Sequence, residues 1–442
     1  MTQGHFTGVA VVIDDEVTHE DKAIRKIIDA IKGSGGHVVE MENLPDPNAN
    51  YRNFSGASFF ILDWNLKGAE LAVEGGGGES IPLPEGLAEQ MLIEKVDFLT
   101  RLRDTRLAPV FIFTAEPIPN VKRALRKHKG LYQDEERSHI FIMSKEEVIK
   151  KGVFAVLNDW IQKHPAALAL KLWEEQYEIA KNAMFVDFHT RDPMWPAFLW
   201  RTFEEDGVPA SDELGQVVSR NIASRMLPIK IDMQAFDKEL EADYKENPEA
   251  YRETLLNVLS GERFVKNVNP GSIAPGDVFK MEGSFWINIR PDCDCIEREG
   301  QPPLTLYLLK GKRLSASGMA SVIDAEKVRF KERDDQELVF SMYEGETMCF
   351  DFKTLYPKPW SEIAGNRVGR LLPPYSTRLQ QRYASYLQRP GLAKMPLEAM
   401  PARIRQDHVA KKAERAVKDA EAAGAKAVNQ AAAGEAAPGA AG

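Results

Sequence analysis

The chain has 442 residues, which is too long for one ordinary hydrophobic core, so two or three domains are expected. A net charge of −9 argues against a general nucleic-acid binder, because such proteins usually carry a basic face. No apolar run approaches the roughly 20 residues of a membrane span, and no signal peptide is visible. Three cysteines without a framework fit a reducing compartment, so we expect a cytoplasmic protein without a membrane partner.

Five apolar runs alternate with helical patterns in the first part of the chain. The runs predict strands at 8–13, 37–41, 57–62, 109–114 and 139–144. The helical patterns lie at 20–32, 86–104, 119–128 and 146–162. This alternation predicts an α/β fold, with a doubly wound five-stranded parallel sheet over residues 1–165. A glycine-rich stretch at 74–79 predicts an inserted surface loop.

The rest of the chain changes character twice. Residues 166–266 are helical in pattern and rich in aromatic residues, which predicts a helical connector or domain. Residues 267–402 carry short strand-like runs between turn residues, which predicts a small β-rich, barrel-like domain with a helix at 376–387. Residues 403–442 form an alanine-rich tail that we expect to be partly helical and then disordered.

Short polar stops end four of the five apolar runs. Asp14 and Asp15 follow the first run, Asp63 the third, Thr114 the fourth and Lys145 the fifth. Buried parallel strands deliver such residues to the carboxyl edge of the sheet, where open α/β sheets place their sites. Three acids, one hydroxyl and one ammonium at one edge predict a site for magnesium and a phosphoryl group.

The acids divide into metal ligands and an acceptor. Mg²⁺ prefers oxygen ligands, and Asp14 and Asp15 would supply them from one strand end. Asp63, on a neighbouring strand, would share the metal, and the backbone carbonyl of Asn65 would add a further ligand. Asp63 would also be the phosphoryl acceptor, because a carboxylate can form an acyl phosphate.

The other two groups would serve the transferred phosphoryl group itself. Lys145 would place a point charge against the phosphoryl oxygens, and phosphoryl transfer depends mainly on such charge neutralisation. The hydroxyl of Thr114 would hydrogen-bond the new phosphoryl group and so respond to its presence.

In these motifs the chain resembles the receiver domain of two-component response regulators. The matching pieces are VVIDDE (11–16), ILDWNLKG (61–68), FTAE (113–116) and SK (144–145). The resemblance implies a flavodoxin-like receiver fold, a Mg²⁺ cofactor and a histidine kinase as phosphodonor. It also implies that Asn65 and Glu116, two residues after the acceptor and two after the threonine, tune water access. Polar residues there predict a short-lived phosphoryl group.

The chain departs from the receiver pattern at three points. The interval from Asp63 to Thr114 is longer than in typical receivers, which is consistent with the glycine-rich insertion. Glu146 follows the lysine where receivers usually carry proline. Ile142 stands where many receivers place an aromatic ring that swings inward on phosphorylation. The chain is therefore expected to accept phosphate without a strong conformational output.

No further catalytic constellation stands out beyond the first third of the chain. We therefore expect no output enzyme, only phosphorylation from a phosphodonor and self-dephosphorylation. This layout resembles receiver proteins of bacterial phage-defence systems, such as the phosphate-buffer component of Detocs. The resemblance implies a phosphate sink, with a second response regulator as a further partner. Two alternatives stay open: a response regulator with a C-terminal binding or effector output switched by phosphorylation, and a scaffold that is not phosphorylated.

Overall fold

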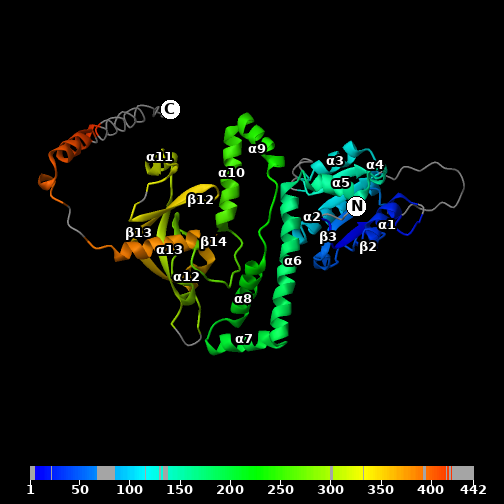
Figure 1. Cartoon of the computed structure of the whole chain (residues 1–442), viewed down its shortest axis with the longest axis horizontal. Coiled ribbons are helices and arrows are strands. Elements are labelled where there is room, and N and C mark those ends of the chain that lie inside the picture. Colours follow the sequence, from blue (N-terminus) through cyan, green and yellow to red (C-terminus); the bar gives the residue numbers. More distant parts are fainter. Residues whose placement is uncertain are drawn as a thin grey trace, which may run out of the picture.

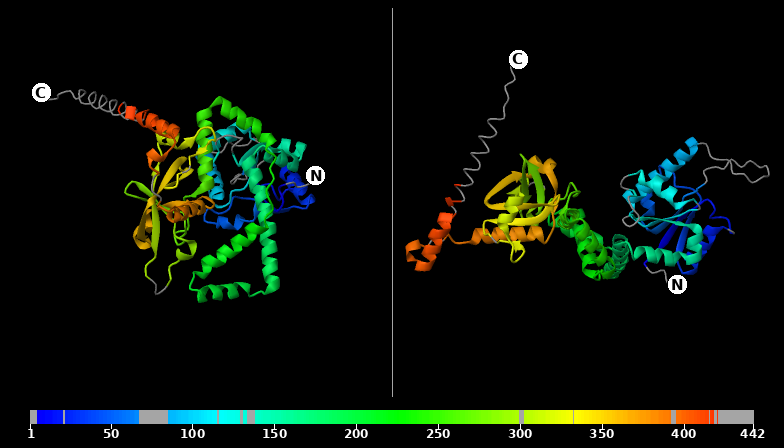
Figure 2. Two further views of the ribbon diagram at one scale, coloured as in Figure 1. Left: turned by 60° about the vertical axis from the view of Figure 1, so that its left-hand side comes forward. Right: turned by 90° about the horizontal axis from the view of Figure 1, so that it is seen from above.

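The computed structural model covers both folded parts of the chain and the helical region between them (Figures 1 and 2). The described residues are 5–20, 22–66, 85–114, 116–128, 131–132, 138–298, 302–331, 333–391, 395–414, 416–417 and 420. The glycine-rich stretch at 74–79 and residues 421–442 of the tail lie outside them. Among the described residues, every helix is too short or too polar to cross a membrane.

A five-stranded parallel sheet forms the centre of the N-terminal part (Figure 1). Its strands are β1 Val9–Ile13, β2 His37–Met41, β3 Ala57–Asp63, β4 Val110–Thr114 and β5 Ile140–Ser144. The hydrogen-bonded order is β2-β1-β3-β4-β5, with every neighbouring pair parallel. This order is that of a flavodoxin-like sheet, so the predicted doubly wound fold is confirmed.

Helices cover both faces of this sheet, which explains why β3 and β4 are buried along their whole length. One face packs on α1 Ala23–Gly33, α4 Lys145–Lys151 and α5 Val153–Ile161. The other packs on α2 Glu85–Thr105 and α3 Ile118–Arg126, with the short η1 Tyr51–Phe54 beside them. The prediction of one helix over 146–162 is wrong in one respect. Gly152 adopts φ 88° and ψ 133°, which ends α4 before α5 begins.

A helical region follows, as predicted for residues 166–266. Its helices are α6 Pro165–Arg191, α7 Trp195–Glu205, α8 Ala210–Arg225, α9 Gln234–Glu246 and α10 Pro248–Arg263. Helix α6 begins against the parallel sheet, where Leu168 joins the core, and then extends away from it (Figure 1). Helix α8 turns back along α6, and the two share a small apolar cluster that includes Ala180, Met184 and Ile222.

The last folded part is a seven-stranded antiparallel sheet that is nearly closed, in agreement with the predicted barrel-like domain. Its strands, in hydrogen-bonded order, are β12 Gln336–Tyr343, β13 Glu346–Pro359, β9 Thr305–Arg313, β8 Ser284–Asn288, β7 Asp277–Met281, β14 Arg367–Leu371 and β6 Phe264–Val265. Strand β6 precedes residue 267, so the sheet starts slightly earlier than predicted. The division into four domains otherwise stays a prediction.

Short elements decorate this sheet. They are η2 Asp292–Asp294, α11 Ala316–Val322, the two-stranded pair β10 Ile323–Asp324 and β11 Arg329–Phe330, α12 Trp360–Ile363, η3 Ala364–Asn366, α13 Tyr375–Gln388 and η4 Leu397–Ala399. Helix α13 corresponds to the helix predicted at 376–387 and contributes Leu379 to the core. Residues 402–414 of the tail region are helical.

Candidate functional site

The polar stops predicted from the sequence lie at the carboxyl edge of the parallel sheet. Asp14 directly follows β1, and Asp63 is the last residue of β3. Thr114 ends β4 and is paired in register with Ser144, the residue before Lys145. Because all five strands run parallel, these strand ends meet at one edge. The sheet order places β3 between β1 and β4, so Asp63 is central among them.

Lys145 connects the two buried acids of this edge. Its Nζ lies 2.7 Å from Asp14 Oδ2 and 2.9 Å from Asp63 Oδ2. The side chains of Asp14 and Asp63 are 0% and 5% exposed. Burial works against the charge of Lys145, but the attraction of Asp63 and Asp14 outweighs it and raises the pKa of this ammonium. Lys145 is therefore charged at neutral pH and held between both carboxylates.

The side chain of Asp14 is fully buried. Burial raises the pKa of Asp14, while hydrogen bonds from Lys145 and from the Glu16 backbone N–H, at 2.9 Å, oppose that rise. The ionised form of such a carboxyl is costly unless positive charge lies close to it. The cluster is thus built to hold cationic charge.

Three carboxylates of this edge could hold a metal ion. Asp14, Asp15 and Asp63 each offer one oxygen, and these oxygens lie within 4.8 Å of one another. A set of carboxylate oxygens suits hard divalent cations such as Mg²⁺ better than metals that prefer nitrogen or sulfur. The residues present thus fit the predicted cofactor in donor type, and the identity of the metal stays a prediction.

Asn65 and Thr114 lie beside the acidic cluster and are joined to it by hydrogen bonds. The backbone N–H of Asn65 donates to Asp63 Oδ1 at 3.1 Å, which fixes the orientation of that carboxylate. The buried Thr114 hydroxyl lies 3.4 Å from Asn65 Oδ1 and accepts a hydrogen bond of 2.9 Å from the Glu116 N–H. The side chain of Glu116 is exposed at the rim. The structure thus brings all the predicted residues together, whereas their catalytic and tuning roles stay predictions.

The structure shows how Ile142 and Glu146, the two residues that depart from the receiver pattern, are accommodated. Ile142 is 3% exposed and packs in the core on the α2 and α3 side of the sheet. Lys145 begins helix α4, and Ser144 caps that helix through its Oγ, which accepts a 3.3 Å hydrogen bond from the Glu147 N–H. Glu146 therefore lies in the first turn of a helix, where an acidic residue is favourable.

Sequence reasoning missed a second buried cation close to the cluster. Lys95 of α2 is 7% exposed, donates to the Trp64 backbone carbonyl and lies 5.2 Å from the Trp64 ring centroid. Burial lowers the pKa of Lys95, while the charges of Glu116, Asp63 and Asp15 oppose that shift. Helical spacing puts Lys95 on the apolar stripe of α2 with Leu92 and Leu99. A lysine within such a stripe was the signal available in the sequence.

Comparisons with known proteins add no further assignment: no family model matches this chain, and no curated protein matches it significantly. The fold and geometry establish a flavodoxin-like N-terminal part with a buried acidic cluster at its carboxyl edge.

Proposed function

We propose that the N-terminal part is a phosphorelay receiver that accepts a phosphoryl group on Asp63 from a histidine kinase. The observation that carries this proposal is the bridge of Lys145 between Asp14 and Asp63, at 2.7 and 2.9 Å, on the carboxyl edge. A structural ion pair needs only one carboxylate. A third acid, Asp15, and a buried hydroxyl, Thr114, beside this bridge favour a site for a divalent cation and a phosphoryl group.

In the proposed transfer, an oxygen of Asp63 attacks the phosphorus of the donor's phosphohistidine. The bond from phosphorus to the histidine nitrogen breaks as the acyl phosphate bond forms, and the nitrogen leaves with its electron pair. The ammonium of Lys145 neutralises the carboxylate before the transfer and the phosphoryl oxygens after it. Asp14 and Asp15 would hold Mg²⁺, which when bound neutralises charge on the phosphoryl oxygens. The hydroxyl of Thr114 turns from Asn65 to the new phosphoryl group.

Loss of the phosphoryl group is governed, in this proposal, by the two polar residues at the rim. Asn65 and Glu116 lie on either side of Thr114 in its hydrogen-bond chain. Both can hold a water molecule in position to attack the acyl phosphate. We therefore expect a short-lived phosphoprotein, and a form stable for many hours at neutral pH would contradict this part of the proposal.

We further propose that the protein acts as a phosphate sink and regulator rather than as a strong switch. The supporting observation is Ile142, an aliphatic side chain packed in the core where a mobile aromatic ring would be needed. An anti-phage defence role, with a second response regulator as the competing acceptor, rests on the layout of the chain. A gene neighbourhood with a hybrid kinase and a receiver fused to an enzyme would support that role.

The phosphoacceptor assignment is tested with Mg²⁺ and acetyl phosphate as a small phosphodonor. Wild-type protein should take up one base-labile phosphoryl group, detected by intact mass, and Asp63→Asn should take up none. Asp29→Asn is the matched control, because Asp29 is an exposed aspartate on α1 of the same sheet unit. Absence of label on the wild type with both acetyl phosphate and the cognate kinase would leave only the scaffold function.

Size and partner binding then separate a sink from a switch. A sink keeps its hydrodynamic radius and partner affinity when Asp63 is phosphorylated. A dimer that forms only on phosphorylation, seen by light scattering, would instead establish a response regulator whose output lies in the C-terminal region.

A further inference from the structure

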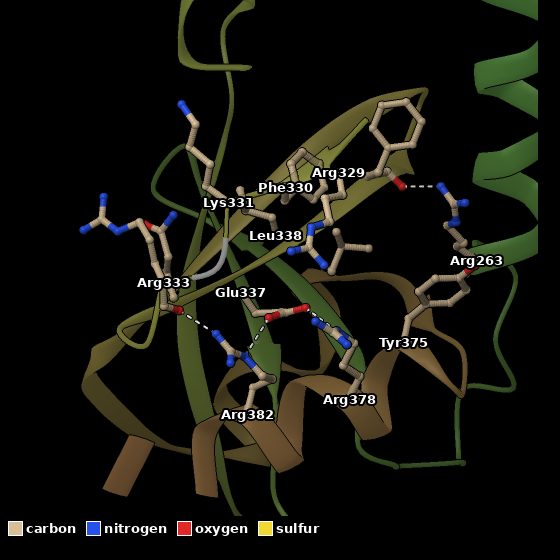
Figure 3. Close-up of a pocket in the computed structure, with 13 residues that line it drawn as sticks. Arg263, Arg329, Phe330, Lys331, Arg333, Glu337, Leu338, Tyr375, Arg378 and Arg382 are labelled. Atoms are coloured by element: carbon tan, nitrogen blue, oxygen red, sulfur yellow. Dashed lines mark hydrogen bonds and ion pairs between the residues drawn. The ribbon is translucent and has the colours of Figure 1, made fainter. Parts of the chain in front are cut away.

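A cavity of about 320 Å³ lies in the C-terminal part, far along the chain from the acidic cluster. Its lining comes from the end of α10, from β11 and the segment after it, from β12 and from α13 (Figure 3). Strand β12 is the terminal strand of the antiparallel sheet, and its residues 336–340 line the cavity. The volume is in the range of small-molecule sites, which usually measure about 300–1,000 Å³.

The cavity is strongly basic in a chain whose net charge is −9. Six of its thirteen lining residues are arginine or lysine, and one, Glu337, is acidic. Asp335 neutralises Arg333 from outside the lining, with two contacts of 3.2 Å. Among the described residues, Arg329 makes no ion pair, and its guanidinium points toward Glu337 from the side opposite α13 (Figure 3). Such a concentration of cations attracts anions.

Glu337 holds two of these arginines in place. Arg378 Nε lies 2.7 Å from Glu337 Oε1, and Arg382 Nε lies 3.2 Å from Glu337 Oε2. The Glu337 side chain is 10% exposed, whereas the side chains of Arg378 and Arg382 are 59% and 24% exposed, so both guanidinium groups remain accessible from solvent. Arg382 also donates through Nη2 to the Arg333 carbonyl at 2.6 Å. A guanidinium has five N–H donors, so fixed guanidinium groups of this kind retain donors for phosphate oxygens.

An apolar wall lies across the cavity from these arginines. Phe330 and Leu338 are half-buried, and Phe340 is 38% exposed. The rings of Phe330 and Phe340 are 6.3 Å apart, and Arg263 lies over the Phe340 ring at 5.7 Å. Figure 3 shows Phe330 and Leu338 on the β-strand side and Arg378 and Arg382 on the α13 side. The cavity thus has Arg378 and Arg382 at one end, and at the other two aromatic rings beside Arg263, which suit a flat ring.

We propose that this cavity binds a nucleotide carrying at least two phosphoryl groups. The phosphoryl oxygens lie among Arg329, Arg378 and Arg382, and the base lies against Phe330 and Phe340. Asp335 pairs with Arg333 and Glu262 pairs with Arg263 at 3.5 Å. The other four lining cations face only the carboxylate of Glu337, so the ligand is expected to carry more than one negative charge. The apolar wall distinguishes a nucleotide from inorganic phosphates, which have nothing to place against it. This site is independent of phosphorylation at Asp63.

The test is isothermal titration calorimetry on the full chain in EDTA, which removes any divalent cation from the acidic cluster. The probes are ADP, AMP, pyrophosphate and a short oligothymidylate. ADP should bind more tightly than each of the other three. Arg329→Glu should weaken ADP binding by at least about tenfold, because a charge-assisted contact is replaced by repulsion. Phe340→Ala should weaken binding of ADP but leave that of pyrophosphate unchanged.

Three variants serve as controls. Arg298→Glu makes the same change of charge at an exposed arginine outside the cavity and should bind ADP as the wild type does. Asp63→Asn should also bind ADP normally. Lys331→Gln, which removes a lining cation whose Nζ contacts the Ser321 carbonyl at 3.2 Å, should have a smaller effect than Arg329→Glu.

Four outcomes would overturn the proposal. They are no binding of ADP by the wild type, equal affinity of wild type and Arg329→Glu, pyrophosphate or AMP binding as tightly as ADP, and tighter binding of the oligothymidylate. The last would establish a nucleic-acid surface instead. Circular dichroism of Arg329→Glu confirms that a loss of binding is not a loss of fold, since Arg329 is an exposed side chain.

Discussion

Lys145 neutralises the buried carboxylates of the acidic cluster when no metal ion is bound. Two buried carboxylates, Asp14 and Asp63, share its ammonium, and burial raises the pKa of Asp14 in spite of that contact. Without the ammonium, both carboxylates would lie in a poorly solvated place with no neutralising lysine between them. The same residue that serves the proposed phosphoryl transfer thus also stabilises the resting fold.

Lys145→Met should therefore lower the free energy of unfolding by about 2–3 kcal/mol, because it leaves two buried carboxylates without their shared partner. Lys150→Met on the same helix is the control, since Lys150 is exposed and its loss should change stability by less than about 0.5 kcal/mol. Urea unfolding followed by tryptophan fluorescence measures both. Equal stability of the two variants would contradict the bridging role of Lys145.

His139 predicts how stability depends on pH. Burial, with a smaller contribution from the charge of Arg103, lowers the pKa of His139 from 6.5 to about 4. Between pH 6.5 and about pH 4, the folded protein thus keeps this imidazole neutral, whereas the unfolded chain protonates it. Stability from the neutral imidazole is full above pH 6.5, decreases as the pH falls below it and is lost below about pH 4.

Between about pH 7.5 and about pH 5, the wild type should therefore lose about 1–2 kcal/mol more stability than His139→Gln does. His37→Gln, at an exposed histidine that begins β2, should follow the wild type. Urea unfolding at the two pH values measures the difference. A wild type and a His139→Gln variant with the same pH dependence would show that His139 does not carry this effect.

Among the helices, the break between α4 and α5 decides how the start of α5 packs against the sheet. Helix α4 starts at Lys145 itself and ends after two turns at Gly152. A continuous helix would hold the following apolar residues, Val153 and Phe154, in a different direction from the sheet face that they now cover. Gly152 has φ 88° and ψ 133°, a conformation that side chains with a Cβ atom disfavour.

Gly152→Ala should accordingly cost about 1–3 kcal/mol of stability, because alanine must be strained into that conformation. Gly33→Ala is a suitable control: a Cβ there meets nothing within 4 Å, and Gly33 lies at the end of α1. That control should be neutral or slightly stabilising. Thermal unfolding of both variants measures the contrast, and a stabilised Gly152→Ala would refute the argument.

Helix α6 links the parallel sheet to the rest of the chain (Figures 1 and 2). Its first turns are anchored near the amino end of β3. Lys171 Nζ donates to the Ser58 carbonyl at 3.0 Å, and Glu174 pairs with Lys171 at 2.8 Å and with Arg106 at 2.6 Å. This anchor lies at the edge of the sheet opposite Asp63. A signal from the acidic cluster would have to cross the sheet to reach it.

Glu174→Ala leaves Lys171 and Arg106 without their shared carboxylate and should loosen the start of α6. Backbone amides of residues 165–175 should then exchange hydrogen at least about tenfold faster, as expected for a local loss of about 1.4 kcal/mol. Glu178→Ala removes only a more exposed pair with Lys181 and should leave exchange unchanged. Unaltered exchange in Glu174→Ala, measured by mass spectrometry, would show that apolar packing alone holds α6.

The amino-acid pattern predicts the succession of strands and helices along the N-terminal part, because buried parallel strands are continuous apolar runs and polar residues directly after them lie at the carboxyl edge of the sheet. For the same reason, the amino-acid pattern alone assigns Asp14, Asp15, Asp63, Thr114 and Lys145 to one edge of the sheet. It also indicates a helical region followed by a β-rich one, since each has its own hydrophobic period.

Contacts between residues far apart in the chain depend on how the helices and strands pack, and the amino-acid pattern does not predict them. The positions of Lys95 beside Trp64 and of Arg329 opposite Arg378 depend on how α2 and α13 pack, which no local pattern contains. The break at Gly152 also escaped prediction, because the apolar spacing on either side of it suits one continuous helix. Local periodicity identifies elements and their buried faces, whereas the partners of a buried charge are set by long-range packing.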